Sequence, residues 1–198
     1  MIIIGIDPSL TSTGICAMRD GIVLSNEAVT SKFTGAKRLS DFKEQLIPKV
    51  CYVADIEDIN EKVVVFIEGY SFGSVGRKEF IAELGGTIRL MLYEQEIEFV
   101  DVPPTVLKKY STGKGVADKV VRAVAVQKQY GVSFPTTDQT DAFCLAILGM
   151  AYLGLVPNLT VFRQEIIDGM KKPKVKKKKP LSWKSNAEKG NAYGAYRV

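Results

Sequence analysis

Four acidic residues occupy positions where a carboxylate could do chemistry. Asp7 ends the first apolar run of the chain, IIIGI, and Glu68 ends a second run, VVVFI. A carboxylate that completes a buried strand is unfavourable without a partner, and ligand sites of α/β sheets form at strand ends. Asp138 and Asp141 are three residues apart at a predicted helix start, where they share one face and suit the positive end of the helix dipole. Each acid alone also fits an ordinary structural role, but the set of four predicts a site for Mg²⁺ or Mn²⁺ of the kind used in two-metal phosphodiester cleavage.

The 198-residue chain contains no histidine, and this absence narrows the chemistry. Ser-His-Asp and Cys-His nucleophile pairs are excluded, and so are His-ligated zinc or iron sites. The three cysteines, Cys16, Cys51 and Cys144, are widely separated and form no CxxC pair, so neither a disulfide framework nor a thiolate zinc site is expected. We expect reduced, buried cysteines in an intracellular protein. No apolar run approaches the roughly 20 residues of a membrane span.

Basic residues are distributed unevenly along the chain. The net charge is +5, but residues 163–198 alone carry 11 Lys/Arg against three acids, so residues 1–162 are net negative. Within that acidic body, lysines gather around the stretch STGKGV, and these are Lys108, Lys109, Lys114 and Lys119. A cationic patch beside an acidic centre suits a phosphate substrate. The alternative for the same lysines is a solvated basic loop.

The elements that must position these residues follow from the hydrophobic pattern. Predicted strands cover 1–7, 14–18, 21–30, 62–68 and 98–102. Predicted helices cover about 36–60 with Pro48 as a kink or break, then 78–95, 104–110, 117–130, 138–155 and a short helix ending near 170. The order predicts an α/β fold in which a mixed central sheet, an antiparallel N-terminal meander plus parallel strands, is flanked by helices on both faces. We expect one domain over 1–157 and a C-terminal extension over 158–198 with a disordered, Lys-rich tail.

Four segments of the chain together resemble a known family. They are IIGIDPSLTSTG (3–14), VFIEGYSFG (65–73), VLKKYSTGKGVADK (106–119) and DQTDAFCLAIL (138–148). In this order and at this spacing they resemble the RuvC-type Holliday-junction resolvases, crossover junction endodeoxyribonucleases of the RNase H-like superfamily. The resemblance covers about residues 1–155 and implies an RNase H-like fold.

The resemblance implies specific roles for the acids and two of the lysines. Asp7, Glu68, Asp138 and Asp141 would be the catalytic acids and would hold two Mg²⁺ ions, with Mn²⁺ as a substitute. Lys119 would also be catalytic, and both Lys119 and Lys108 would lie near the scissile phosphate or the DNA backbone. The implied reaction is the resolution of four-way DNA junctions, in recombination and repair, by paired symmetric nicks that leave 5′-phosphate and 3′-hydroxyl ends.

The resemblance also implies partners and DNA contacts. Branched DNA would be the substrate and a homodimer the acting form, with much of the dimer contact on the helix over 78–95; Gly85-Gly86 in that helix could permit close approach or simply pack against the sheet. The family places an aromatic wedge shortly after the catalytic glutamate. Here Ser71 stands where that wedge is expected, so either Tyr70 or Phe72 could serve, or both could belong to the core. The other predicted DNA contacts are Lys109, Lys114, Arg77 and Lys78.

The segment KKPKVKKKK at 171–179 departs from the family, whose core ends near the last predicted helix. We interpret it as an arm that adds salt-sensitive DNA affinity. A solubilising end and a nuclear import signal are the alternatives. The expected location is the cytoplasm of a bacterial or phage-infected cell, or the nucleus if the source is a eukaryotic virus.

Three other functions fit parts of the same pattern. A fork or flap nuclease of the same fold would use the same acids on other branched DNA. A non-catalytic DNA-binding module would keep the basic patch without cleaving. An actin-like or sugar-kinase ATPase also opens with a strand, an Asp and a Ser/Thr-Gly hairpin, but it needs a second phosphate loop and an adenosine motif that this chain does not display.

Overall fold

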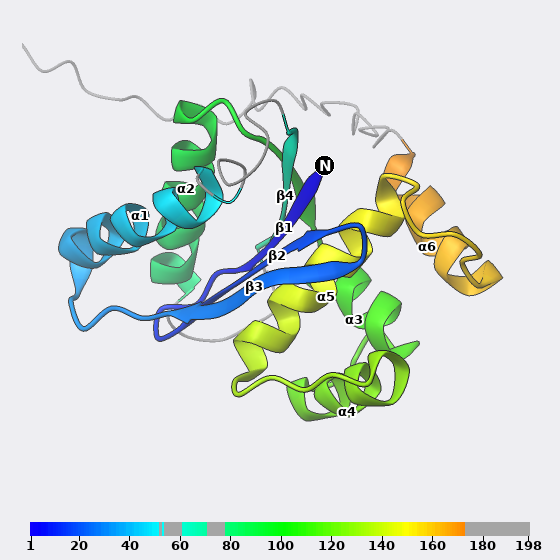
Figure 1. The fold of residues 1–198 in the computed structure, drawn as a ribbon. Coiled ribbons are helices and arrows are strands. Elements are labelled where there is room, and N and C mark those ends of the chain that lie inside the picture. Colours follow the sequence, from blue (N-terminus) through cyan, green and yellow to red (C-terminus); the bar gives the residue numbers. More distant parts are fainter. Residues whose placement is uncertain (52, 54–60, 71–77, 173–198) are drawn as a thin grey trace, which may run out of the picture.

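A five-stranded mixed sheet forms the centre of the protein (Figure 1). The computed structural model describes residues 1–51, 53, 61–70 and 78–172. The strands are β1 (Ile2–Asp7), β2 (Thr13–Arg19), β3 (Ile22–Val29), β4 (Val63–Glu68) and β5 (Glu98–Val102), in the spatial order β3-β2-β1-β4-β5. The first three pair antiparallel, and β4 and β5 continue the sheet parallel to β1. The predicted meander and mixed sheet are therefore confirmed.

Helices cover both faces of this sheet, as the sequence predicts (Figure 1). One face carries α1 (Gly35–Cys51) and α2 (Lys78–Glu94). The other carries α5 (Thr137–Tyr152), backed by α3 (Pro104–Thr112), α4 (Lys119–Tyr130) and α6 (Val161–Lys171). No helix among the described residues is long and apolar enough to cross a membrane.

Strand alternation decides which way the two strand-end acids point. In β1, Ile2, Ile4 and Ile6 belong to the core under α1 and α2, whereas Ile3 belongs to the core under α5. Because side chains alternate between faces along a strand, Asp7 lies in phase with Ile3 and faces α5. In β4, Phe66 is on the α5 side, so Glu68 follows the same rule. The two acids come next in the parallel register after the pair Ile6–Ile67, so they lie on adjacent strands.

Two glycines let α5 lie directly on the sheet. A Cβ atom at Gly5 would come within 2.0 Å of the Ala142 carbonyl oxygen, and one at Gly14 would come equally close to the carbonyl oxygen of Asp138. Any larger residue at either position would hold α5 away from β1 and β2. The absence of these two side chains therefore brings the first turn of α5 beside the end of β1.

The structure corrects several details of the sequence prediction. Helix α4 begins at Lys119 and not at residue 117, and α5 ends at Tyr152 and not at residue 155. Pro48 does not break α1, which continues to Cys51. Helix α5 begins at Thr137, one residue earlier than predicted, because Thr136 caps it by accepting from the Gln139 backbone N–H. Cys16 and Cys144 are buried as expected, but Cys51 is only half-buried.

Part of the C-terminal extension packs against the domain core. Ile167 of α6 is buried in the core on the α5 side. Arg163 places its guanidinium 4.8 Å from the centre of the Tyr110 ring and donates to the Tyr110 carbonyl oxygen at 3.3 Å. Helix α6 is thus held on α3, whereas the lysines after Lys172 lie outside the described residues.

Candidate active site

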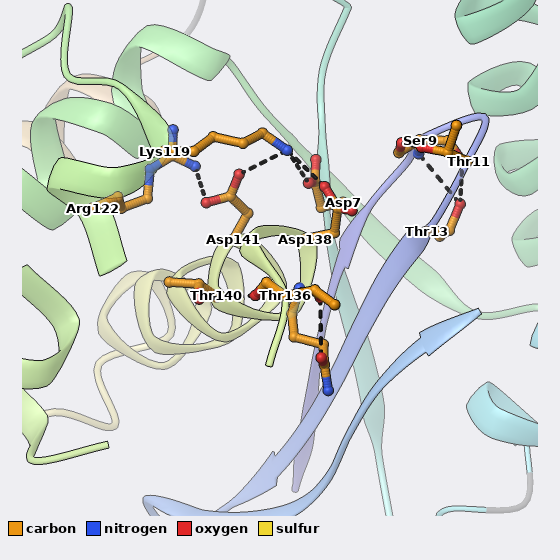
Figure 2. A network of polar contacts seen from close by, with 11 residues as sticks. Asp7, Ser9, Thr11, Thr13, Lys119, Arg122, Thr136, Asp138, Thr140 and Asp141 are labelled. Carbon is orange, nitrogen blue, oxygen red and sulfur yellow. Dashed lines mark hydrogen bonds and ion pairs between the residues drawn. The ribbon is translucent and has the colours of Figure 1, made fainter. Parts of the chain in front are cut away.

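The four predicted acids meet where β1 and β4 end and α5 begins. Asp7 is 3% exposed and Asp141 is 1% exposed, whereas Glu68 and Asp138 are half-buried. They come from segments up to 134 residues apart in the chain, and the sheet register and the glycine contacts of α5 bring them together. Figure 2 shows Asp7, Asp138 and Asp141 directed toward one point.

Polar side chains anchor the first turn of α5 to β3. Gln139 donates from its amide nitrogen to the Asn26 carbonyl oxygen at 2.9 Å, and Asn26 donates back to the Gln139 carbonyl oxygen at 3.2 Å. Thr140 donates to the Thr136 carbonyl oxygen one turn earlier. Since buried hydrogen bonds of this kind specify a single arrangement, they fix the direction in which Asp138 points.

The ammonium group of Lys119 lies at the point where the acids converge (Figure 2). Its Nζ is 2.6 Å from Asp138 Oδ1, 3.6 Å from Asp141 Oδ2 and 3.7 Å from Asp7 Oδ2. Burial lowers the pKa of Lys119, but the neighbouring carboxylates outweigh burial, and the net pKa is raised above its ordinary value. Lys119 is therefore a permanent cation whose half-exposed side chain reaches in from the start of α4.

Arg122 approaches the same acids from one helical turn further along α4. Its guanidinium forms an ion pair with Asp141, and both side chains are 2% exposed. Because this ion pair engages Oδ1 of Asp141, Oδ2 is the oxygen that remains directed toward Lys119. Helix α4 thus presents two cations, three residues apart, to the two acids that are three residues apart on α5.

Burial and mutual repulsion raise the pKa values of two acids. Asp7 has a pKa well above its ordinary value because it is desolvated and because the Glu68 carboxyl group lies beside it. Asp141 has a pKa raised to about 6 by burial and by Asp7, although Arg122 and Lys119 act in the opposite direction. Crowded, desolvated carboxylates of this kind are typical of sites that need additional positive charge.

The donor set fits a hard divalent cation. All four groups are carboxylates, the ligands that Mg²⁺ and Mn²⁺ prefer. Asp7 Oδ2 is buried and accepts no hydrogen bond from any described residue, so it has coordination capacity to spare. No three acids of the described part of the chain enclose one ion as they stand, since the Lys119 ammonium lies between them.

A cleft of about 460 Å³ opens onto these acids. Its lining includes Asp7, Glu68 and Asp141 together with Lys108 and Lys119. Lys109 and Lys114 are exposed but do not line the cleft. Of the predicted basic contacts whose side chains the structure describes, Lys108 and Lys119 thus share the cleft with the acids.

Tyr70 lines the same cleft and is 40% exposed. Its ring lies against the guanidinium of Arg89 and beside Gly85 of α2. The Gly85 position, for which the sequence suggested a dimer contact or packing on the sheet, therefore faces the cleft. Phe72 and Arg77 lie outside the described residues, and so does the side chain of Lys78.

Two arginines near the acids, Arg122 and Arg89, were not predicted from the sequence. Arg122 follows Lys119 at the same spacing as the two aspartates of α5, so a search for matched i, i+3 charges on neighbouring helices could have found it. Arg89 lies in the middle of α2, and its partners belong to β4 and β5. No local pattern in the chain indicates those contacts.

Comparison with known proteins agrees with this arrangement. A family model described as "Crossover junction endodeoxyribonuclease RuvC" matches residues 3–149. The solved structure of RuvC from Thermus thermophilus is similar with a TM-score of 0.58 and 19% identity, covering 78% of this chain and 98% of that one. The structure of T. thermophilus RuvC in complex with a Holliday junction substrate is similar with a TM-score of 0.56 and 20% identity, covering 74% and 91%. These two structures have the same fold as this chain.

Proposed function

Because the chain belongs to the RuvC family of crossover junction endodeoxyribonucleases, we propose that it resolves four-way (Holliday) DNA junctions by paired symmetric nicks. The products are 5′-phosphate and 3′-hydroxyl ends. One observation carries this proposal: Asp7, Glu68 and Asp141 line a cleft together with Lys108 and Lys119, and Asp138 is paired with Lys119 beside them, in a chain that matches the family over residues 3–149. Nucleases of the RuvC type depend on metal ions, and the acids of this chain are suited to hold them.

The proposed cofactor is a pair of Mg²⁺ ions, with Mn²⁺ as a substitute. Asp7 lies near two other acids, Glu68 and Asp138, and would hold the ions together with them and with Asp141. Bound ions of this kind lower the pKa of an attacking water and stabilise the leaving oxygen. The raised pKa values of Asp7 and Asp141 support the proposal, because added positive charge would relieve the repulsion that raises them.

Four other residues of the cleft have proposed roles: three contact the DNA, and one orients an acid. Lys119 contacts the acids and is half-exposed, so its ammonium can turn from the carboxylates to a phosphate oxygen. Lys108, which also lines the cleft, supplies a second cation for the DNA backbone. Arg122 stays buried with Asp141 and keeps that carboxylate ionised and oriented. Tyr70 offers an aromatic surface for an unstacked base, with Phe72 as the alternative.

The proposed acting form is a homodimer. Two symmetric cuts across one junction require two active sites related by a two-fold axis. Helix α2 supports this assignment, because Phe80, Ile81, Leu90 and Tyr93 are large apolar side chains that it leaves exposed. Exposed apolar groups concentrated on one element are typical of a protein–protein interface.

The test is cleavage of a synthetic mobile four-way junction beside a Y-fork, a flap and linear duplex, with Mg²⁺ and with EDTA. We expect paired, ligatable nicks on the junction with Mg²⁺ and none with EDTA. Asp7→Asn should bind the junction without cutting it. Asp20→Asn, a change of the same kind in the β2–β3 turn, should cut like the wild type.

Three outcomes would contradict the proposal in different ways. Equal or better cutting of forks or flaps would make the protein a general branched-DNA nuclease. Junction binding without Mg²⁺- or Mn²⁺-dependent cutting would make it a binding module. Ligatable cuts that are not paired across the junction would contradict the dimer.

A further inference from the structure

The guanidinium of Arg89 joins α2 to the ends of two strands. Its Nη2 donates to the Glu68 carbonyl oxygen at 3.2 Å, and its Nε and Nη2 donate to Asp101 Oδ1 at 2.8 and 2.5 Å. Its Nη1 donates to the Gly85 carbonyl oxygen one turn back in α2, at 2.8 Å. One side chain, 13% exposed, therefore connects the ends of β4 and β5 to a helix.

Arg89 also fixes an aromatic ring in the cleft. Its guanidinium carbon lies 4.5 Å from the centre of the Tyr70 ring, in a cation–π contact. Gly85 leaves the space for this arrangement: a Cβ there would come within 2.9 Å of Arg89 Nη1 and 3.2 Å of Tyr70 Cε1. A Cβ at Gly86 would fit without displacing any atom, since its nearest neighbour would be the Tyr70 hydroxyl at 3.9 Å.

Arg89 does not pair with the Glu68 carboxylate. Arg89 contacts the backbone carbonyl of Glu68, and the acid that balances its charge is Asp101 on the next strand. A guanidinium paired directly with the Glu68 carboxylate would compete with a cation for the same oxygens. Here the positive charge contacts the peptide, and the Glu68 carboxylate faces Asp7 instead of the guanidinium.

We infer that Arg89 is a positioning residue for the active site, holding the Glu68 backbone and the Tyr70 ring in the orientation that cleavage requires. The inference rests on the proposed function, in which Glu68 is a metal ligand. Such ligands must be held within about 0.5 Å of their productive position by surrounding contacts. Glu68 is the last residue of β4, where the chain pairs with Val102 of β5 and the Gly69 N–H donates to the Val102 carbonyl oxygen, and the bond from Arg89 to the Glu68 carbonyl oxygen adds a restraint from α2.

The matched pair Gly85→Ala and Gly86→Ala tests this inference. Both changes place the same methyl group in α2 and favour the helix equally. Only the first displaces the end of the flexible Arg89 side chain, so the protein should still fold. Because removing a group that orients a metal ligand typically lowers metal affinity or activity 10- to 100-fold, we expect Gly85→Ala to bind Mn²⁺ about tenfold more weakly and to have a correspondingly lower kcat. Gly86→Ala should match the wild type.

The measurements are Mn²⁺ binding without DNA, by electron paramagnetic resonance, and single-turnover junction cleavage. Arg89→Lys keeps the charge but cannot make the same set of bonds, so it should behave like Gly85→Ala. Junction Kd should stay within about threefold for both variants, because the lysines that contact phosphates are unchanged.

Equal Mn²⁺ affinity and equal kcat in Gly85→Ala and Gly86→Ala would overturn the inference. So would an Arg89→Lys protein that unfolds at a lower temperature while its Mn²⁺ affinity and kcat stay at wild-type values, because that is the result of a purely structural role. If the wild type binds Mn²⁺ but cuts no junction, the proposed function fails. In that case weaker Mn²⁺ binding by Gly85→Ala would still support the role of Arg89.

Discussion

At the scale of single residues, the Asp7 carboxylate is unfavourable for stability, although the proposed reaction needs it. Its carboxylate is buried beside Glu68, with Asp138 also nearby, and these surroundings favour the neutral form. Lys119 offsets part of this repulsion from a half-exposed position. Active sites commonly retain such unfavourable groups because the reaction needs them.

Replacing Asp7 should therefore stabilise the protein while it abolishes activity. Asn has nearly the same shape and carries no charge, so Asp7→Asn should increase the free energy of unfolding at pH 7 by about 1–2 kcal/mol in EDTA. Junction cleavage should fall below detection. Urea unfolding and the cleavage assay provide the two measurements, and a less stable Asp7→Asn protein would contradict our account of the site.

The pH dependence of stability follows from Asp141. Its pKa is about 6 in the folded protein, against an ordinary value of 3.8, so between these values the folded state binds more protons than the unfolded state. The metal-free protein should therefore lose stability as the pH rises from about 4 to about 6, by an amount on the order of 2–3 kcal/mol for this group. Asp7, whose pKa is also raised, adds a loss of the same sign.

Urea unfolding in EDTA at pH 5 and at pH 7 would measure the part of this loss that falls above pH 5. Asp141→Asn should show a smaller difference between the two pH values, whereas the exposed Asp20→Asn should show the wild-type difference. Adding Mg²⁺ at pH 7 should restore stability, because a ligand that binds only the folded state stabilises it. A wild-type protein more stable at pH 7 than at pH 5 in EDTA would contradict the raised pKa values.

At the scale of elements, the position of α5 determines the site. The helix lies on β1 and β2 only because Gly5 and Gly14 have no side chains, and its first turn is tied to β3 through Gln139 and Asn26. A displacement of this helix would move Asp138 and Asp141 together and leave Asp7 behind. The contact of α5 with β1 and β2 therefore sets the distances between the acids.

Gly14→Ala should separate the acids while leaving all of them in the chain. The new Cβ would lie 2.0 Å from the Asp138 carbonyl oxygen, so the first turn of α5 must move. Overpacking of this kind typically costs about 1–3 kcal/mol of stability. Cleavage should fall by more than the folded fraction accounts for.

Gly169→Ala is the matched control, because nothing lies near its Cβ position in α6. Thermal unfolding and cleavage rates per folded molecule distinguish the two variants. Wild-type cleavage by folded Gly14→Ala would show that the α5 contact does not set the geometry of the acids.

At the scale of the whole molecule, positive charge is concentrated at the C-terminus. Residues 173–198 contain eight Lys/Arg and one Glu, so the chain without them would change from a net charge of +5 to −2. Such a segment attracts DNA without regard to sequence and makes affinity depend on salt. It follows α6, which is held on α3 through Arg163.

Removing residues 173–198 should weaken DNA binding and reduce its salt dependence. The plot of log affinity against log salt concentration should become less steep, because fewer counterions are released. The cleavage rate at saturating junction should stay at the wild-type value, since the acids and Lys119 remain. Fluorescence anisotropy at several salt concentrations measures the first effect, and an unchanged slope would favour the tail as a solubilising end.

The chemistry available to this protein follows from residue types and short spacings in the chain. The absence of histidine, the acids at the ends of two apolar runs and the pair of aspartates three residues apart depend only on residue type and short spacing. Element types, their order and the mixed sheet also follow from local periodicity, and the structure confirms them. The bounds of single elements follow from the sequence less closely. Helix α1 continues past Pro48 to Cys51, because packing stabilises a helix beyond what its local sequence favours.

The surroundings of the acids, in contrast, depend on how distant segments pack in three dimensions. The ion pair of Arg122 with Asp141, the place of Lys119 among three carboxylates and the contacts of Arg89 with Glu68 and Asp101 all join segments distant in the chain. No periodic pattern encodes such contacts, because they depend on sheet register and on how closely a helix approaches a strand. The roles of Gly14 and Gly85 are of the same kind: a missing side chain has meaning only once the atoms that fill its space are known.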